Sequence, residues 1–270
     1  MTRKSWLLLA LAAWLAPLAS AATALPSPAS SATHVAVAPA SAAPGPAELS
    51  MQQTVFNRTA LPPSTKLIYR VDSNKFPFRV RAELQWLQQE AGYQARMNFS
   101  VFGLTRTQAS QGTFDAYGLA PERFTDTFRK DEMAHFDREQ GIVRFSANTP
   151  EATLQPGAQD RLSVTLQLAA LLASAPQRFP VGTTLRVQTV SHRDADVWRF
   201  KFGPLETLQL PGGALQGFKL ERLPRRAEDQ QLEIWLAPSL AYMPVRIRLT
   251  EPNGDYADQL WLASEATDRP

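Results

Sequence analysis

The sequence contains no cysteine, only three histidines and no marked excess of charge of one sign. Without cysteine the chain has no disulfide framework, no thiolate metal site, no iron–sulfur cluster and no cysteine nucleophile. A three-histidine metal site would need His34, His135 and His192 together, and His34 lies in a stretch of low complexity. We therefore predict no metal site and no cofactor.

After residue 21 no apolar run approaches the roughly 20 residues that a membrane-spanning helix needs. The one marked run, Trp6–Leu15, follows a short basic start, ends at Pro17 and precedes the small residues Ala19-Ser20-Ala21. This order is typical of an export signal. We predict that residues 1–21 are a signal peptide cleaved near Ala21, and that the mature protein is periplasmic with no integral membrane segment.

The charges nearly balance, with 28 basic and 25 acidic residues among 270. Removing Arg3 and Lys4 with the signal peptide would leave 26 basic and 25 acidic residues. Such a surface lacks the concentrated positive charge that nucleic-acid-binding proteins use. We therefore predict no nucleic-acid partner.

Composition divides the rest of the chain into three parts. Residues 22–55 are rich in Ala, Pro and Ser and are predicted to be a linker, because such a segment cannot bury a core. Residues 56–265 alternate apolar and polar side chains repeatedly and are predicted to form a single β-rich domain. Residues 266–270 are left as a tail.

The alternation is longest at Phe78–Trp86 and resumes at Tyr93–Val101 after a break at Ala91-Gly92. This pattern predicts a long antiparallel hairpin with one apolar and one wet face. Asn253-Gly254 is the strongest turn signal in the chain and predicts a hairpin between the last two strands. About a dozen strands follow one another without the strand–helix alternation of parallel sheets.

One segment, Asp160–Ser174, breaks the strand pattern and predicts the only helix of the domain. Asp160 is a good N-cap residue with Ser163 three positions later, and Pro176 and Pro180 prevent continuation. We therefore predict an all-β, mostly antiparallel fold. It is a strongly curved, open or partly closed β-barrel of about a dozen strands, with one helix packed on or in it.

Two polar segments offer catalytic interpretations beside structural ones. His192–Asp196 has the residue types of a metal or acid–base loop, but a polar hairpin loop explains it as well. Asp160 and Ser163 could form a catalytic pair, but helix capping accounts for their spacing. The chain has no nucleophile elbow, zinc-protease motif or phosphate-binding loop. Whether the protein is an enzyme stays uncertain, and a non-catalytic role is favoured.

Aromatic and leucine side chains provide a different set of candidates. In a strongly curved sheet, side chains on the concave face either fill the interior or leave an apolar cavity. Both alternatives remain open from the sequence. If there is a cavity, the predicted ligand-binding residues are Trp86, Phe99, Leu166, Leu168, Leu172, Trp198, Phe200 and Trp235.

Four segments carry a resemblance to a known family: LPPSTKLIYRV, GAQDRLSVTLQLAALL, WRFKFGPLETLQLPGG and LEIWLAPSLAYMPVRIRLTEPNGDYADQLW. From about Leu61 to Ser264 the chain resembles the DUF3108 family (domain of unknown function 3108) of exported bacterial proteins. The family has no assigned activity, so the resemblance implies no catalytic residues. It implies an architecture similar to the open, curved barrel of periplasmic lipoprotein carriers of the LolA/LolB type.

Three function classes follow from these observations. The favoured one is a non-catalytic binder of an apolar ligand, a lipid or a lipoprotein acyl chain, held in the curved sheet. The first alternative is an envelope assembly or scaffold protein that binds another protein, and the second is a hydrolase with an unrecognised site. The possible partners are thus a lipid, a lipoprotein or an envelope protein.

Overall fold

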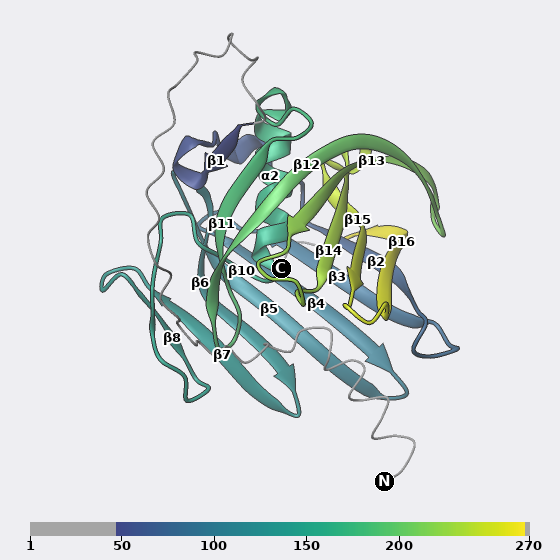
Figure 1. Cartoon of the computed structure of the whole chain (residues 1–270), viewed down its shortest axis with the longest axis horizontal. Helices are drawn as coiled ribbons and strands as arrows, with labels where there is room; N and C mark the ends of the chain where they lie inside the picture. The colour runs from purple at the N-terminus through teal and green to yellow at the C-terminus, as the bar shows by residue number, and fades with distance from the viewer. Residues whose placement is uncertain (1–46, 268–270) are drawn as a thin grey trace, which may run out of the picture.

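The computed structural model describes residues 47–267, in which sixteen strands form one strongly curved sheet around a single α-helix, α2 (Figure 1). The predicted signal peptide and most of the predicted linker, including His34, lie outside the described residues. Within residues 47–267 no helix has the length and apolarity needed to cross a membrane.

The helix α2 spans Ser163–Ser174, and short 3-10 helices are η1 (Met51–Gln53), η2 (Arg58–Ala60), η3 (Pro176–Arg178) and η4 (Pro238–Leu240). The strands are β1 (Glu48–Ser50), β2 (Thr65–Ser73), β3 (Val80–Gln88), β4 (Tyr93–Val101), β5 (Leu104–Asp115), β6 (Gly118–Phe128), β7 (Lys130–Asp137), β8 (Ile142–Phe145), β9 (Ala152–Thr153), β10 (Gln159–Asp160), β11 (Thr184–Val190), β12 (Ala195–Leu210), β13 (Gly213–Leu223), β14 (Gln231–Ala237), β15 (Met243–Thr250) and β16 (Tyr256–Ala266).

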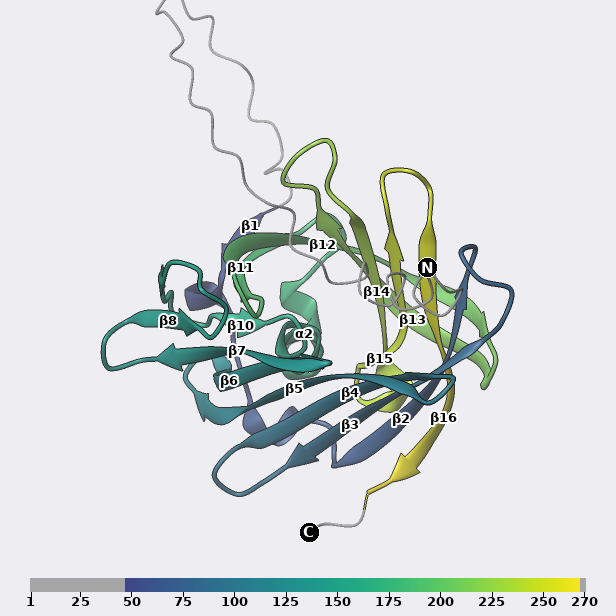
Figure 2. The ribbon, with the colours of Figure 1, turned by 90° about the horizontal axis from the view of Figure 1, so that it is seen from below.

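The sheet runs in the order β1-β11-β12-β13-β14-β15-β16-β2-β3-β4-β5-β6-β7-β8-β9, and β10 pairs with β11. Only β1 and β10 are parallel to their neighbour; every other pairing is antiparallel among the described strands. The C-terminal strand β16 pairs with β2, so the sheet curves round and its two ends approach each other (Figure 2). There Gln188 of β11 accepts from Gln155 N and donates to Thr153 O, both at 2.8 Å. Side-chain hydrogen bonds therefore link the two ends of a sheet that is not closed.

Both predicted hairpins are present. In the first, β3 pairs with β4, with Arg81 opposite Ser100 and Gln88 opposite Tyr93. In the second, β15 pairs with β16 through a turn in which Gly254 has a φ of 84°, a conformation that favours glycine. The antiparallel, mostly β fold is therefore confirmed.

The strand count is sixteen rather than about a dozen, for one main physical reason. Three short strands, β1, β9 and β10, contain only two or three residues each, too few to show an alternating pattern. The strand β12 also continues past Gly203-Pro204, because the register shift between Phe202 and Leu205 accommodates these two residues. The predicted linker 22–55 overlaps β1 and η1, and Met51 of η1 is buried against the core.

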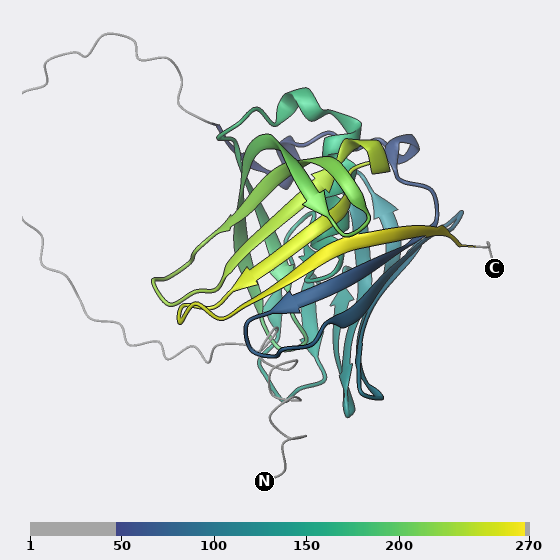
Figure 3. The ribbon, with the colours of Figure 1, turned by 90° about the vertical axis from the view of Figure 1, so that its right-hand side faces the viewer.

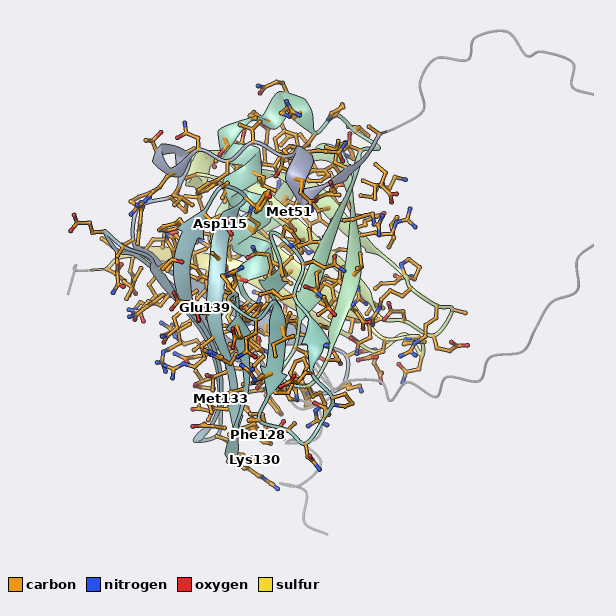
Figure 4. All side chains as sticks on the ribbon, turned by 90° about the vertical axis from the view of Figure 1, so that its left-hand side faces the viewer. Met51, Asp115, Phe128, Lys130, Met133 and Glu139 are labelled. Atoms are coloured by element: carbon orange, nitrogen blue, oxygen red, sulfur yellow. The ribbon has the colours of Figure 1, made fainter. Side chains whose placement is uncertain are left out.

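Figure 4 shows the turn of the β6–β7 hairpin, marked by Phe128 and Lys130, at the lower end of the molecule and Met51 in its upper part.

The helix begins as its capping residues predict. Asp160 Oδ1 accepts from Ser163 N at 2.7 Å, and Ser163 Oγ accepts from Asp160 N at 2.8 Å, which are the two hydrogen bonds of a capping box. The helical residues start at Ser163 rather than Asp160, since the intervening two residues form a turn.

The helix is buried on all sides, inside the curved sheet (Figures 2 and 3). Leu162, Leu166 and Ala170 pack into the apolar cluster of β2–β8, whereas Leu168 and Leu172 pack into the cluster of β11–β14. The helix thus fills part of the interior and divides the core in two.

Candidate functional site

A cavity of about 840 Å³ lies inside the curved sheet, beside the first turns of α2. Such a volume is in the range of pockets that enclose a small ligand. Its wall comes from α2 and from the strands β3–β5 and β12–β16, and these strands surround the helix in Figure 2. The lining residues are Leu84, Met97, Phe99, Gln108, Thr149, Pro150, Arg161, Leu162, Thr165, Leu166, Arg193, Asp194, Asp196, Trp198, Arg222, Arg225, Arg226, Asp229, Gln230, Leu232, Pro244, Ile247, Leu249, Ala257 and Gln259.

One part of the wall is apolar and continuous across three strands. Leu232 of β14, Leu249 of β15 and Ala257 of β16 occupy neighbouring positions in the sheet, since Leu249 is paired with both of the others. Leu232 and Leu249, together with Ile247, are only half-buried although they line the cavity. These side chains therefore keep apolar surface that an occupant could cover.

The other part of the wall is charged. Its carboxylates are all in ion pairs: Asp229 with Arg222 at 3.0 Å and with Arg225 at 2.9 Å, Asp196 with Arg225, and Asp194 with Arg161 at 3.9 Å. Asp196, Arg225 and Arg226 are exposed, so this end of the cavity meets solvent. We call the five lining arginines and three lining aspartates the polar mouth.

The guanidinium groups of two arginines of the polar mouth lie close to the ring of Trp198. The Arg222 guanidinium carbon is 4.6 Å from the ring centre, and that of Arg161 is 5.8 Å away. Burial lowers the pKa of Arg222 to about 10. Burial alone would raise the pKa of Asp229, but the hydrogen bond from Arg225 and the charge of Arg222 outweigh it and lower the pKa to about 2. At neutral pH both partners are charged.

His192, from the loop predicted as a metal or acid–base site, lies in a buried polar group next to the polar mouth. Its Nε2 is 3.0 Å from Glu132 Oε2 and accepts from Arg193 Nε at 3.0 Å, while Arg193 also donates to Glu132 at 2.9 Å. Burial lowers the pKa of His192, which agrees with a neutral, accepting imidazole. Within residues 47–267, no three or more His, Asp and Glu side chains are arranged to hold a metal ion.

The predicted pair Asp160 and Ser163 is buried at the start of α2 and does not line the cavity. Asp160 Oδ2 accepts from Ser110 Oγ at 2.5 Å, and its Oδ1 accepts from Leu162 N at 2.9 Å as well as from Ser163 N. Burial nevertheless raises the pKa of this carboxyl to about 6. The geometry is that of a helix cap joined to β5.

The Asp160 carboxyl predicts a pH dependence of stability. Because its pKa is raised to about 6 on folding, the folded protein binds the proton more tightly, and Asp160 makes the free energy of unfolding rise as the pH falls. Between pH 7 and pH 5 the gain from Asp160 is about 1 kcal/mol. The Asp160→Asn variant is expected to lack this gain in urea unfolding at the two pH values.

The comparison with wild type isolates Asp160, because His192, whose pKa is lowered, changes stability in the opposite direction in both proteins. Asp131→Asn, at an exposed position, is the matched control and is expected to keep the wild-type difference between the two pH values. Identical pH profiles for wild type and Asp160→Asn would contradict the prediction.

The structure brings three of the eight predicted ligand-binding residues to the cavity: Phe99, Leu166 and Trp198. The other five lie elsewhere, in packed clusters. Trp86 belongs to the cluster of β2–β8, Leu168, Leu172 and Phe200 belong to that of β11–β14, and Trp235 packs with Leu208 and Ala237. Trp235 also donates from Nε1 to Glu206 at 2.7 Å.

The sequence interpretation missed the apolar wall on β14–β16, and of the polar mouth it singled out only the loop His192–Asp196. The alternation of Val245, Ile247 and Leu249 with arginines does signal one apolar face of β15. No local signal joins that loop to the other arginines of the polar mouth, which come from separate segments of the chain.

One solved structure shows the same kind of fold, and a second aligns with a similar share of the chain at a lower score. A β-barrel-like protein of a domain of unknown function, DUF1849, from Brucella abortus aligns with 77% of this chain and 100% of its own, at 10% identity and a TM-score of 0.51. The MucA/MucB complex of Pseudomonas aeruginosa aligns with 77% of this chain and 53% of the other, at 9% identity and a TM-score of 0.35. No curated protein matches the sequence.

The family comparison agrees with the resemblance carried by the four sequence segments. The family model described as "Protein of unknown function (DUF3108)" matches residues 68–260, well over half of the chain. The chain belongs to the DUF3108 family.

Proposed function

We propose that this protein is a non-catalytic, periplasmic binder of an apolar ligand, a lipid or a lipoprotein acyl chain. The observation that carries the proposal is the cavity of about 840 Å³ with a half-buried apolar wall. Periplasmic location rests on the export-signal pattern of residues 1–21.

The apolar wall gives the ligand its driving force. Leu232, Ile247 and Leu249 face the cavity without being fully buried, so a hydrocarbon occupant would remove their surface, and its own, from water. Each methylene buried in this way contributes about 0.8 kcal/mol. Phe99, Leu166 and Trp198 extend the apolar surface from the strands to the helix.

A tryptophan in the apolar wall tests the proposal by filling the cavity. Leu249→Trp is expected to weaken binding of laurate by about tenfold or more, because the larger ring occupies the space of the chain. Since Leu249 is only half-buried, the variant is expected to fold. The measurement is isothermal titration of the delipidated protein, together with native mass spectrometry of the protein exported to a bacterial periplasm and purified without detergent.

The matched control is Leu205→Trp, the same substitution at an exposed leucine of β12 outside the cavity. It is expected to bind as wild type does. Equal affinities of Leu249→Trp and wild type, or no binding by wild type, would overturn the proposal.

One observation favours a second candidate function, assembly with another envelope protein. Phe102, in the β4–β5 turn, is 74% exposed and meets the edge of Phe78 at 4.9 Å between ring centres. Leu104, two residues further along the chain, is 37% exposed, and an exposed apolar patch larger than a single side chain is what marks a contact surface. A wild-type protein that carries no lipid and binds none would favour this candidate over the first.

A further inference from the structure

The polar mouth carries more positive than negative charge. Among the residues that line the cavity, five are arginines and three are aspartates. All three aspartates are in ion pairs with arginines, as described above, and Arg193 pairs with Glu132. Arg226 is exposed and makes no ion pair with any residue of 47–267. The mouth therefore has positive charge that the described protein groups do not neutralise.

Arg222 is a buried cation with unused hydrogen-bonding capacity. Its hydrogen bonds run from Nη2, to Asp229 Oδ1 at 3.0 Å and to the carbonyl oxygen of Gln230. Its side chain is only 4% exposed, and its Nε has no hydrogen-bond partner among the described residues. A guanidinium group has five N–H donors, and leaving donors unpaired in a buried site is unfavourable. Arg222 also lines the cavity, so an anion held there would lie next to its positive charge.

The position of these arginines decides which kind of anion fits. Arg222 of β13 is paired with Leu232 of the apolar wall, and Arg226 lies in the loop between β13 and β14. A free inorganic anion would use the polar mouth but leave the apolar wall uncovered. A molecule with an anionic head and a hydrocarbon chain would cover both, since guanidinium groups bind carboxylate and phosphate oxygens with charge-assisted hydrogen bonds.

We propose that the ligand is an anionic amphiphile, whose carboxylate or phosphate head binds Arg222 and Arg226 at the polar mouth while its chain lies against the apolar wall. This inference rests on the proposed function and narrows it from apolar ligands in general to those with a negatively charged head. Neutral lipids and zwitterionic heads are then poorer ligands than anionic ones with the same chain.

The test compares ligands that share a chain and differ in the head. Laurate is expected to bind the wild-type protein about tenfold or more tightly than dodecanol. Lysophosphatidic acid is expected to bind more tightly than lysophosphatidylcholine, a comparison that separates an anionic phosphate head from a zwitterionic one. Inorganic phosphate alone is the third arm and is expected not to compete with laurate at millimolar concentration.

Two arginine variants locate the head. Arg226→Gln and Arg222→Gln are each expected to weaken laurate binding about fivefold to tenfold and to leave dodecanol within about twofold of wild type. Arg226 is exposed, so its variant keeps the test valid if Arg222→Gln fails to fold. Arg248→Gln is the matched control, because Arg248 pairs with Asp258 at 3.3 Å and does not line the cavity.

The outcomes separate the inference from the function on which it rests. Dodecanol binding as tightly as laurate, or arginine variants that weaken both ligands equally, would overturn the anionic head while leaving an apolar binder. Competition by inorganic phosphate with no chain dependence would overturn it in favour of a free-anion site. Binding of none of the ligands would overturn both.

Discussion

Asp126→Ala is expected to lower the free energy of unfolding by about 3–5 kcal/mol, because it breaks a buried ion pair. Asp126 and Arg106 are both buried, and they are joined by two hydrogen bonds, from Arg106 Nε to Oδ1 at 2.8 Å and from Nη2 to Oδ2 at 2.6 Å. Gln108 donates to the same carboxylate at 3.0 Å. Removing the carboxylate leaves a buried guanidinium without its counter-charge.

The measurement is urea unfolding followed by tryptophan fluorescence. Glu83→Ala is the control, because Glu83 pairs at 2.8 Å with Arg81, whose side chain is 54% exposed, and a surface ion pair contributes only about 0–1 kcal/mol. Replacing both partners in the double variant Arg106→Met/Asp126→Leu is expected to recover much of the lost stability, since neither charge of this pair is then left buried alone. A loss below about 1 kcal/mol in Asp126→Ala would contradict the prediction.

Trp86→Ala is expected to destabilise the protein by about 3–5 kcal/mol through loss of packing. Trp86 is 1% exposed, its ring centre lies 5.6 Å from that of Tyr93, and its Nε1 donates to the carbonyl oxygen of Pro62 at 3.0 Å. The substitution therefore leaves a cavity in the β2–β8 cluster and an unpaired carbonyl oxygen. The loss in free energy of unfolding is measured by the same urea unfolding experiment.

Trp261→Ala is the matched control, because Trp261 is only half-buried and is expected to cost less. Trp86 does not line the cavity, so the folded Trp86→Ala protein is expected to bind laurate with wild-type affinity. Weakened binding with unchanged stability would instead place Trp86 in contact with the ligand, as the sequence interpretation had it.

The elements that carry a strong local pattern were predictable from the sequence. The β3–β4 and β15–β16 hairpins follow from nine-residue alternation and from Asn253-Gly254, and the helix start follows from Asp160 and Ser163. Each of these signals acts within a few residues of chain, so no knowledge of the tertiary fold is needed to interpret it.

For β5, local alternation does not predict which face of the strand is buried. Arg106, Gln108 and Ser110 are buried, and they alternate with Thr107, Ala109 and Gln111, so polar residues occupy both faces of the strand. Alternation cannot tell which polar set faces inward, because the partners Asp126 and Asp160 that make burial favourable lie far along the chain.

The candidate site, too, was predictable from the sequence only in part. Aromatic and leucine side chains on strands and helix predicted a curved apolar interior, but not which of them pack in the core and which line an open space. That distinction depends on how far α2 fills the interior, a property of the whole sheet's curvature. Hence Phe99, Leu166 and Trp198 line the cavity, whereas Trp86, with the same residue type as Trp198, does not.

By itself, the sequence determined the antiparallel β class, the single helix with its cap, and membership of the DUF3108 family, because these depend on local periodicity, turn chemistry and extended similarity. Only the tertiary structure decided the order of sixteen strands, the placement of the helix inside them and the polar mouth. Arg161, Arg193 and Arg222 come together there because segments far apart in the chain converge when the sheet curves, and no local pattern encodes that convergence.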